Sequence, residues 1–292
     1  MYNLTITNTE NGYSLDFNNP GSPFIVTEIL GLDPPDATIN IDEYATLDGG
    51  IYNSSKANVR EMQIAFAIDY NAAANRQKVY RVLQPGRKVR IDYTDQEGLA
   101  VYTEGYVGKP QVEHFAKKQT VTVAITCPES YWQAMDQIIA DFVTITGAFT
   151  FPFYGDNTNP NIYFGTKTVE DEMVIYNDGN VPAGFIAEVL FRETSTYLVI
   201  YNQDTGQSVH LDLTRCSIVA GDIVTIDTRP NSKSVTLTRS GTTTSIFWTV
   251  DYQYMDDFPM LEPGANTILV DAEYESDMPE VNVTEQLLYE GV

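Results

Sequence analysis

The chain has 292 residues, of which 43% are hydrophobic and 12% aromatic, and it carries a formal net charge of −23. This apolar content excludes an intrinsically disordered chain, and the length allows two domains with a core each. No apolar run is long enough to cross a membrane as a helix, and the first four residues do not open a signal peptide. We therefore expect neither a membrane span nor secretion by the usual route.

The negative charge is concentrated in the second half of the chain. Residues 1–135 contain 11 Lys/Arg and 16 Asp/Glu, whereas residues 136–292 contain 6 and 24. Because nucleic acids are bound largely through Lys and Arg that neutralise phosphates, we expect no nucleic-acid partner. A charge of this size keeps a protein on a particle surface soluble, and a specific cationic partner is the second explanation.

Cysteine and histidine are scarce. Cys127 and Cys216 lie in apolar, strand-like contexts in different halves of the chain, and free buried thiols are expected, although their positions leave a disulfide open. His114 and His210 are the two histidines of the chain. We therefore expect no metal site and no cofactor.

The chain opens with short segments of alternating polarity that predict β-strands. Asn11-Gly12 stands between the first two segments, which is the strongest local signal for a β-hairpin. The turn Gly31–Pro35 ends the third segment, because its two prolines fix the backbone. The expected strands begin with residues 2–6, 13–17 and 24–26.

Residues 36–59 contain few strand signals. Breakers such as Asp48-Gly49-Gly50 and Asn53-Ser54-Ser55 interrupt the segment, and we expect a long loop. A loop of this length in a compact domain is usually functional or covered by a partner, and a mobile surface excursion is the alternative.

One helix is predicted in the first half. It follows a strand over residues 60–70, in which Met62, Ile64, Phe66 and Ile68 share a face. The side chain of Asn71 is expected to cap the helix, and Pro85-Gly86 to stop it. Its apolar stripe is typical of core packing and consists of Ala72, Asn75, Val79, Val82 and Leu83.

Residues 98–132 read as two strands joined by a turn, preceded by a strand over residues 88–93. The first strand alternates around residues 101–106, and the second is the β-branched run 120–127. Pro128 cannot donate to a ladder and ends the second strand. We place the end of a first domain, residues 1–135, shortly after this point.

The second half predicts a β-sandwich over residues 136–280. Residues 136–165 show little periodicity and are interpreted as a linker. From residue 168 on, short strands recur at the regular spacing of an all-β sandwich, with no βαβ rhythm. The expected strands are residues 173–176, 183–191, 197–201, 208–213, 223–227, 234–239, 243–250 and 266–272.

The order of several segments resembles the distal tail proteins of long-tailed phages (siphophages). In the first half these segments are GLDPPDATIN, LDGGIYNSSKANVREMQIAFAI and VTVAITCPESYW, and in the second IYNDGNVPAGF, IVAGDIVTIDTRPNSKSVTL and LEPGANTI. The resemblance covers most of residues 25–135 and, more loosely, 175–270. It implies a mainly β protein of two domains: a ring-forming domain with one helix and a hairpin, then a galectin-like antiparallel β-sandwich.

The same resemblance implies a structural role at the phage tail tip. The expected partners are other copies of the chain in a hexameric ring, the tail tube protein, the tail-tip hub protein, and receptor-binding or adhesion proteins. The expected location is the virion tail tip, after synthesis in the host cytoplasm. Since the loop 36–59 faces neighbouring subunits in this family, the candidate interface residues are Asp48, Gly49, Tyr52, Asn53, Ser54 and Ser55.

No catalytic motif accompanies these features. The nucleophile elbow, the Walker loop, the dinucleotide fingerprint and HExxH are all absent, and we expect no enzyme. The carboxylate groups Asp256-Asp257 and Glu170-Asp171-Glu172 are interpreted as solvated turns rather than a glycosidase pair. The second candidate class is a carbohydrate-binding adhesin, in which Tyr252 and Tyr254 share one strand face and contact the sugar, while Trp248 is core.

Residues 281–292 fit the predicted sandwich poorly, because Pro279 marks a break before them. Leu287-Leu288-Tyr289 is too apolar to remain in solvent, so we expect this tail to pack on the first domain or on a neighbouring subunit. The alternative is an unstructured terminus.

Overall fold

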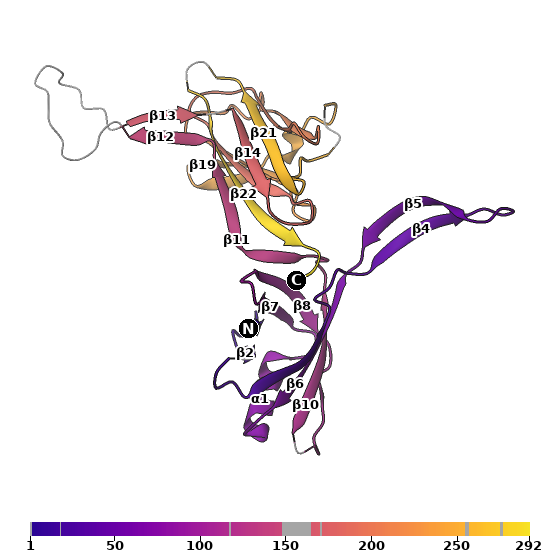
Figure 1. Ribbon diagram of the computed structural model, residues 1–292. Coiled ribbons are helices and arrows are strands. Elements are labelled where there is room, and N and C mark those ends of the chain that lie inside the picture. Colours follow the sequence, from indigo (N-terminus) through magenta and orange to yellow (C-terminus); the bar gives the residue numbers. More distant parts are fainter. Residues whose placement is uncertain are drawn as a thin grey trace, which may run out of the picture. The chain divides into compact units, whose positions relative to one another are not determined.

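The computed structural model describes residues 2–17, 19–116, 118–147, 165–169, 171–254, 257–274 and 277–292 (Figure 1). The chain divides into two compact units: Met1–Asp136 together with Leu288–Val292, and Gln137–Leu287. The protein is mainly β, with antiparallel pairing throughout the described strands, and the expected fold class is confirmed.

The first unit is a curved antiparallel sheet around one helix. Its strands pair in the order β2-β1-β7-β8-β10-β6-β3, and β9 adds to β10. The inward residues of these strands form one core, to which Leu4, Phe66 and Val123 contribute. The strand bounds are β1 Asn3–Asn8, β2 Ser14–Phe17, β3 Phe24–Leu30, β6 Arg60–Ile68, β7 Lys88–Thr94, β8 Ala100–Val107, β9 Gln111–Val112 and β10 Gln119–Cys127.

The helix α1 (Ala72–Val82) packs on β1, β2 and β6. Asn75, Val79 and Val82 are its buried residues, as its stripe predicts. The expected side-chain cap is wrong. Asn71 adopts a left-handed conformation with φ 48°, which asparagine tolerates better than most residues, and its side chain makes no capping hydrogen bond. Its backbone carbonyl instead accepts from the N–H of Asn75 at 3.0 Å.

The second unit is a sandwich of two antiparallel sheets. One sheet has the order β22-β15-β18-β19-β20, and the other β14-β21-β16-β17. Alternate residues of both sheets enter a shared core that includes Phe185, Ile200 and Val270. The bounds are β14 Glu172–Asn177, β15 Phe185–Leu190, β16 Tyr197–Asn202, β17 Ser208–Asp212, β18 Ile223–Asp227, β19 Ser234–Arg239, β20 Thr242–Ser245, β21 Gly264–Ala272 and β22 Glu280–Tyr289.

Two segments differ from the sequence-based expectation. The first part of the expected linker forms strands. They are β11 (Trp132–Asp141) and β12 (Val143–Gly147), and β12 pairs with β13 (Gly165–Val169). Residues 148–164 lie outside the described residues. The expected tail also begins as a sandwich strand, because residues 280–285 of β22 pair with β15 and bury Val281 and Val283. Leu288–Val292 alone group with the first unit.

The cysteines are free thiols in this structure. Cys127 is buried in the first unit, where burial raises the pKa of its thiol to about 11. Cys216 is half-buried in the second unit, and burial raises its pKa as well. Both thiols are therefore protonated and poorly reactive at neutral pH.

The pairing of β22 predicts where the second unit can be cut. Residues 137–287 expressed alone should unfold in one cooperative β-type transition, because they contain the whole sandwich core. A fragment ending at residue 279 lacks β22, uncovers β15 and loses two buried valines, so its melting temperature should be lower. Circular dichroism on both fragments measures this, and equal melting temperatures would contradict the role of β22.

Candidate assembly interface

Residues 37–57 form a two-stranded hairpin, which we call the arm. Its strands are β4 (Ala37–Glu43) and β5 (Gly50–Ala57), and among the described residues each pairs with no strand but the other. The ribbon of the arm extends away from the sheet of the first unit that it belongs to (Figure 1). The expected loop is therefore wrong, because Thr38-Ile39-Asn40-Ile41-Asp42 alternates as a strand and finds its partner after the turn.

The arm has one apolar and one mostly polar face. Side chains of paired residues point to the same side of a sheet, and Ile39 pairs with Ser55 while Ile41 pairs with Tyr52. The hydroxyl groups of Tyr52 and Ser55 are 2.8 Å apart, which agrees with a shared face. The opposite face carries Thr38, Asn40 and Asp42, paired with Lys56, Ser54 and Ile51.

The apolar face of the arm is uncovered in the single chain. Ile39 is 60% exposed and Tyr52 is 61% exposed, although isoleucine and tyrosine at alternate positions are typical of a buried strand face. A two-stranded hairpin without a supporting core is marginally stable in water. The arm therefore has the properties of a surface that another protein covers.

The predicted interface residues are distributed over this arm. Tyr52 and Ser55 lie on the apolar face, whereas Ser54 lies on the polar face and accepts from Asn40 Nδ2 at 2.9 Å. Asn53 lies at the β-bulge, and Asp48 and Gly49 form the turn at the tip. The sequence-based selection missed the exposed apolar residues Ile39, Ile41 and Leu47.

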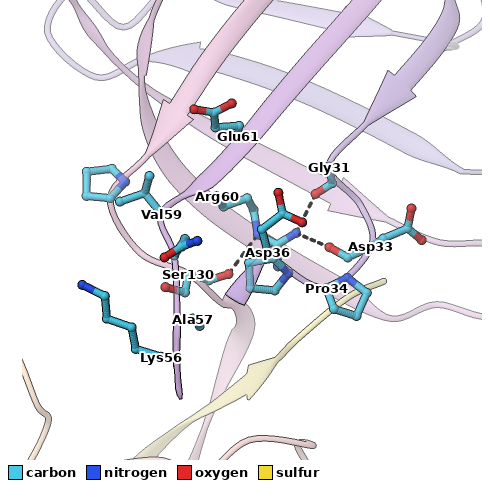
Figure 2. Close-up of a pocket in the computed structure, with 13 residues that line it drawn as sticks. Gly31, Asp33, Pro34, Asp36, Lys56, Ala57, Val59, Arg60, Glu61 and Ser130 are labelled. Carbon is cyan, nitrogen blue, oxygen red and sulfur yellow. Dashed lines mark hydrogen bonds between the residues drawn. The ribbon is translucent and has the colours of Figure 1, made fainter. Parts of the chain in front are cut away.

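A buried arginine holds the root of the arm. Arg60 begins β6, three residues after β5 ends, and its side chain is almost completely buried above the ring of Trp132, with the guanidinium carbon 5.2 Å from the ring centroid. Burial lowers the pKa of Arg60, although the charge remains. The guanidinium donates to the backbone carbonyls of Gly31 at 2.6 Å, Asp33 at 2.7 Å and Ser130 at 3.1 Å (Figure 2). It also donates to a fourth backbone carbonyl, that of Glu290.

These contacts join four segments of the first unit at one point, which we call the Arg60 clamp. Residue 31 must be glycine for its backbone to lie this close to β6. Its φ is +94°, and a Cβ at this position would lie 2.4 Å from the carbonyl oxygen of Glu61. The N–H of Val292 donates to the carbonyl of Leu32 at 3.0 Å, so the C-terminus is part of the clamp. A pocket of about 830 Å³, lined by Pro34, Lys56 and Glu61 among others, opens beside it (Figure 2).

The sugar-contact candidates occupy a turn of the second unit rather than a strand face. Tyr252 and Tyr254 are both exposed, and the backbone N–H of Gln253 between them donates to the carboxylate of Asp251 at 3.0 Å. The ring of Tyr254 lies 5.8 Å from that of His210, whose Nε2 is 3.0 Å from the hydroxyl of Ser208. The two tyrosines are two positions apart in the chain, but no strand places them on a common face.

Other residues considered from the sequence have structural or surface positions. Trp248 is 57% exposed, so its expected core position is wrong, because residues 247–249 form a 3₁₀ turn instead of a strand. Asp257 accepts from Lys233 Nζ at 2.5 Å, and His114 is on the surface. Asp256 and Glu170 lie outside the described residues.

The described part of the chain offers neither a metal centre nor a membrane span. No three His, Cys, Asp or Glu side chains in it are grouped to hold an ion. The helix in that part is far too short and polar to cross a bilayer.

Comparison with known proteins supports the resemblance found in the sequence. Residues 178–286 match the sequence model of the family described as "Siphovirus-type tail component, C-terminal domain". No curated protein sequence matches the chain.

Two solved structures share the fold over nearly the whole chain. The crystal structure of the Dit protein (gp 19.1) of phage SPP1 has a TM-score of 0.64 at 13% identity, covering 97% of this chain and 98% of that one. A chain of the activated, calcium-bound baseplate of phage P2 has a TM-score of 0.51 at 12% identity, with both chains fully covered. The expected resemblance to siphophage tail components is confirmed.

Proposed function

We propose that this chain is a structural protein of a phage tail tip that assembles into a ring, with the arm as the contact between neighbouring copies. The match of residues 178–286 to the siphovirus-type tail component family supports a phage tail or baseplate protein. The single observation that carries the ring is the uncovered apolar face of the arm.

An arm that reaches out from one copy makes a heterologous contact, because it meets a different surface on the next copy. Repeated contacts of this kind close into a ring when the rotation between copies permits. From the resemblance to distal tail proteins, the expected ring has six copies. It would join the tail tube to the tail-tip hub and carry receptor-binding or adhesion proteins, in the virion and without catalytic activity of its own.

Substitutions on the two faces of the arm test the ring. Ile41→Asn removes an apolar anchor from each interface, which is worth about 1.5–3 kcal/mol per copy, so the ring should dissociate into smaller species at micromolar concentration. Ile51→Asn is the matched control, because Ile51 is an equally exposed isoleucine on the polar face. Native mass spectrometry and light scattering give the oligomeric state.

The wild-type chain should also protect residues 36–59 from limited proteolysis when it is assembled. A strictly monomeric wild-type chain at high concentration, with this segment cleaved rapidly, would refute the ring. Equal dissociation of the Ile41 and Ile51 variants would show that the apolar face of the arm is not the contact.

A further inference from the structure

One outer face of the sandwich is unusually aromatic. In this sheet, β14-β21-β16-β17, residues of β14, β16 and most of β21 alternate between the core and the surface, and Ile175, Ile200 and Ile268 point into the core. The side chains of the opposite parity point outward. They include Val174, Tyr176, Leu269, Tyr197, Val199 and Tyr201, which we call the tyrosine face.

The other sheet of the sandwich does not share this property. A solvated outer face is normally polar, and on β18, β19 and β22 threonines such as Thr225, Thr236 and Thr284 occupy it. In the described part of the second unit, the exposed aromatic side chains on the strands of the two sandwich sheets are Tyr176 and Tyr197, which lie on the tyrosine face together with the exposed Val174. On the other sheet, β11, which pairs with β22, exposes Ile139. The asymmetry indicates that the two faces have different surroundings in the assembled particle.

The register places these side chains in one continuous surface. Leu269 pairs with Tyr201, and Asp271 pairs with Val199, which in turn pairs with His210. The hydroxyl of Tyr197 donates to Asp271 at 3.3 Å, and the ring of Tyr254 borders His210 at the edge of the sheet. The ring of Tyr197 therefore lies between two carboxylates, because Tyr197 pairs with Asp212 on β17 and donates to Asp271 on β21.

The charge of the tyrosine face has one sign. Its four strands contain Glu172, Asp212 and Asp271 and no Lys or Arg; of the residues that flank them, Asp204 and Glu273 are acidic, and Arg215, whose charge acts on Asp212, is basic. Hydrogen bonds from Thr214 lower the pKa of Asp212, so this carboxylate stays ionised well below neutral pH. The lysines and arginines of the second unit all lie on other strands or in loops.

We propose that the tyrosine face docks a protein partner that presents arginine side chains. Guanidinium groups stack on tyrosine rings and pair with carboxylates, so this surface satisfies both preferences of arginine. Tyrosine-rich surfaces with few lysines are typical of protein interfaces. A second copy of the same face would bring carboxylate against carboxylate, and phosphate-bearing partners would be repelled, which excludes both as the occupant.

The test uses the full chain and two labelled probes, a nona-arginine and a nona-lysine peptide, in fluorescence anisotropy. We expect nona-arginine to bind several-fold more tightly, because lysine stacks less well on aromatic rings. The double variant Tyr176→Ala/Tyr197→Ala should abolish this preference. The double variant Glu172→Lys/Asp271→Lys should weaken nona-arginine binding by about tenfold.

The control variant is Glu188→Lys with Glu193→Lys, which makes the same charge change away from the tyrosine face, on β15 and in the loop after it. If this control weakens the binding of nona-arginine as much as Glu172→Lys/Asp271→Lys does, the peptide is attracted by the overall negative charge of the chain, and the proposal fails. Equal affinity for the two peptides also contradicts it. A glycan array that shows a ligand lost in Tyr252→Ala/Tyr254→Ala would instead favour the carbohydrate-binding alternative. None of these variants changes the arm, so peptide binding is measured independently of ring formation.

Discussion

Replacing Arg60 with methionine is expected to lower the stability of the first unit by several kcal/mol, because a hydrogen bond that involves a charged group contributes about 1.5–3 kcal/mol. Methionine keeps an apolar stem of similar length but donates no hydrogen bond, so the four carbonyls of the clamp lose their donor. Each buried carbonyl left without a partner costs about 1–3 kcal/mol unless water reaches it. Chemical denaturation monitored by tryptophan fluorescence measures the change, since Trp132 lies under the guanidinium.

Arg90→Met is the matched control for this prediction. Arg90 is an arginine of the same unit that pairs with Asp92 at 2.6 Å in a partly exposed position, so its loss should cost less than about 1 kcal/mol. Deleting residues 288–292 removes one of the four acceptors and the packing of Tyr289 and Val292, and should give an intermediate loss. Equal stabilities of the Arg60 and Arg90 variants would show that the clamp does not hold the unit together.

The clamp also connects stability to assembly. Arg60 binds the carbonyl of Gly31, where the loop that leads into β4 begins. Arg60 itself lies three residues after the end of β5. Both strands of the arm thus start from points that Arg60 holds. An arm that is uncovered along its length can keep a constant direction only if its root is rigid, and this is the contribution of the buried arginine.

Replacing Glu285 with glutamine is expected to stabilise the second unit at alkaline pH and to leave it unchanged at acidic pH. The Glu285 side chain is fully buried on β22, and within the described residues neither carboxylate oxygen has a hydrogen-bond partner. Burial, with a smaller contribution from the charge of Asp178, raises the pKa of Glu285 from 4.5 to about 7. Folding is therefore favoured with the proton bound.

The sign of the pH dependence follows from this shift. Between pH 4.5 and about 7 the folded chain keeps a proton that the unfolded chain releases, so stability falls as the pH rises through this window. A pKa shift of this size lowers the free energy of unfolding by about 3 kcal/mol at pH values above 7. Glutamine carries no charge, so the variant should melt about 5–10 °C higher at about pH 8 and equally at about pH 5.

Thermal scans at both pH values check the prediction, with Glu188→Gln as the control. Glu188 is an exposed glutamate on β15, the strand that pairs with β22, and its replacement should change little at either pH. A Glu285 variant that is less stable than the wild type at both pH values would contradict the uncompensated burial. It would imply that the carboxylate has a partner in the assembled protein.

Local sequence patterns determined most of the individual elements. Alternation over β6, β7, β8 and β10, the turn residues of the sandwich and the alanine-rich start of α1 are signals that each segment carries by itself. The order of short segments was also sufficient to indicate the family of tail components and the two-domain, mainly β fold. These features are local because hydrophobic periodicity and turn chemistry depend on neighbours in the chain.

The tertiary structure decided which strands have partners and which side chains lose water. The alternation of residues 38–42 indicates a strand, but whether its apolar face meets a core or remains open depends on where the hairpin lies, and here it is open. Arg60 reads as a polar residue at the start of a strand, and its role follows from carbonyls as distant in sequence as Glu290. Glu285 follows two inward valines in β22, and pairing with Phe185 buries in the sandwich a carboxylate that the sequence assigns to a tail packed on the first domain or on a neighbouring subunit. Burial and long-range hydrogen bonds are properties of the folded chain, which is why local patterns do not reveal them.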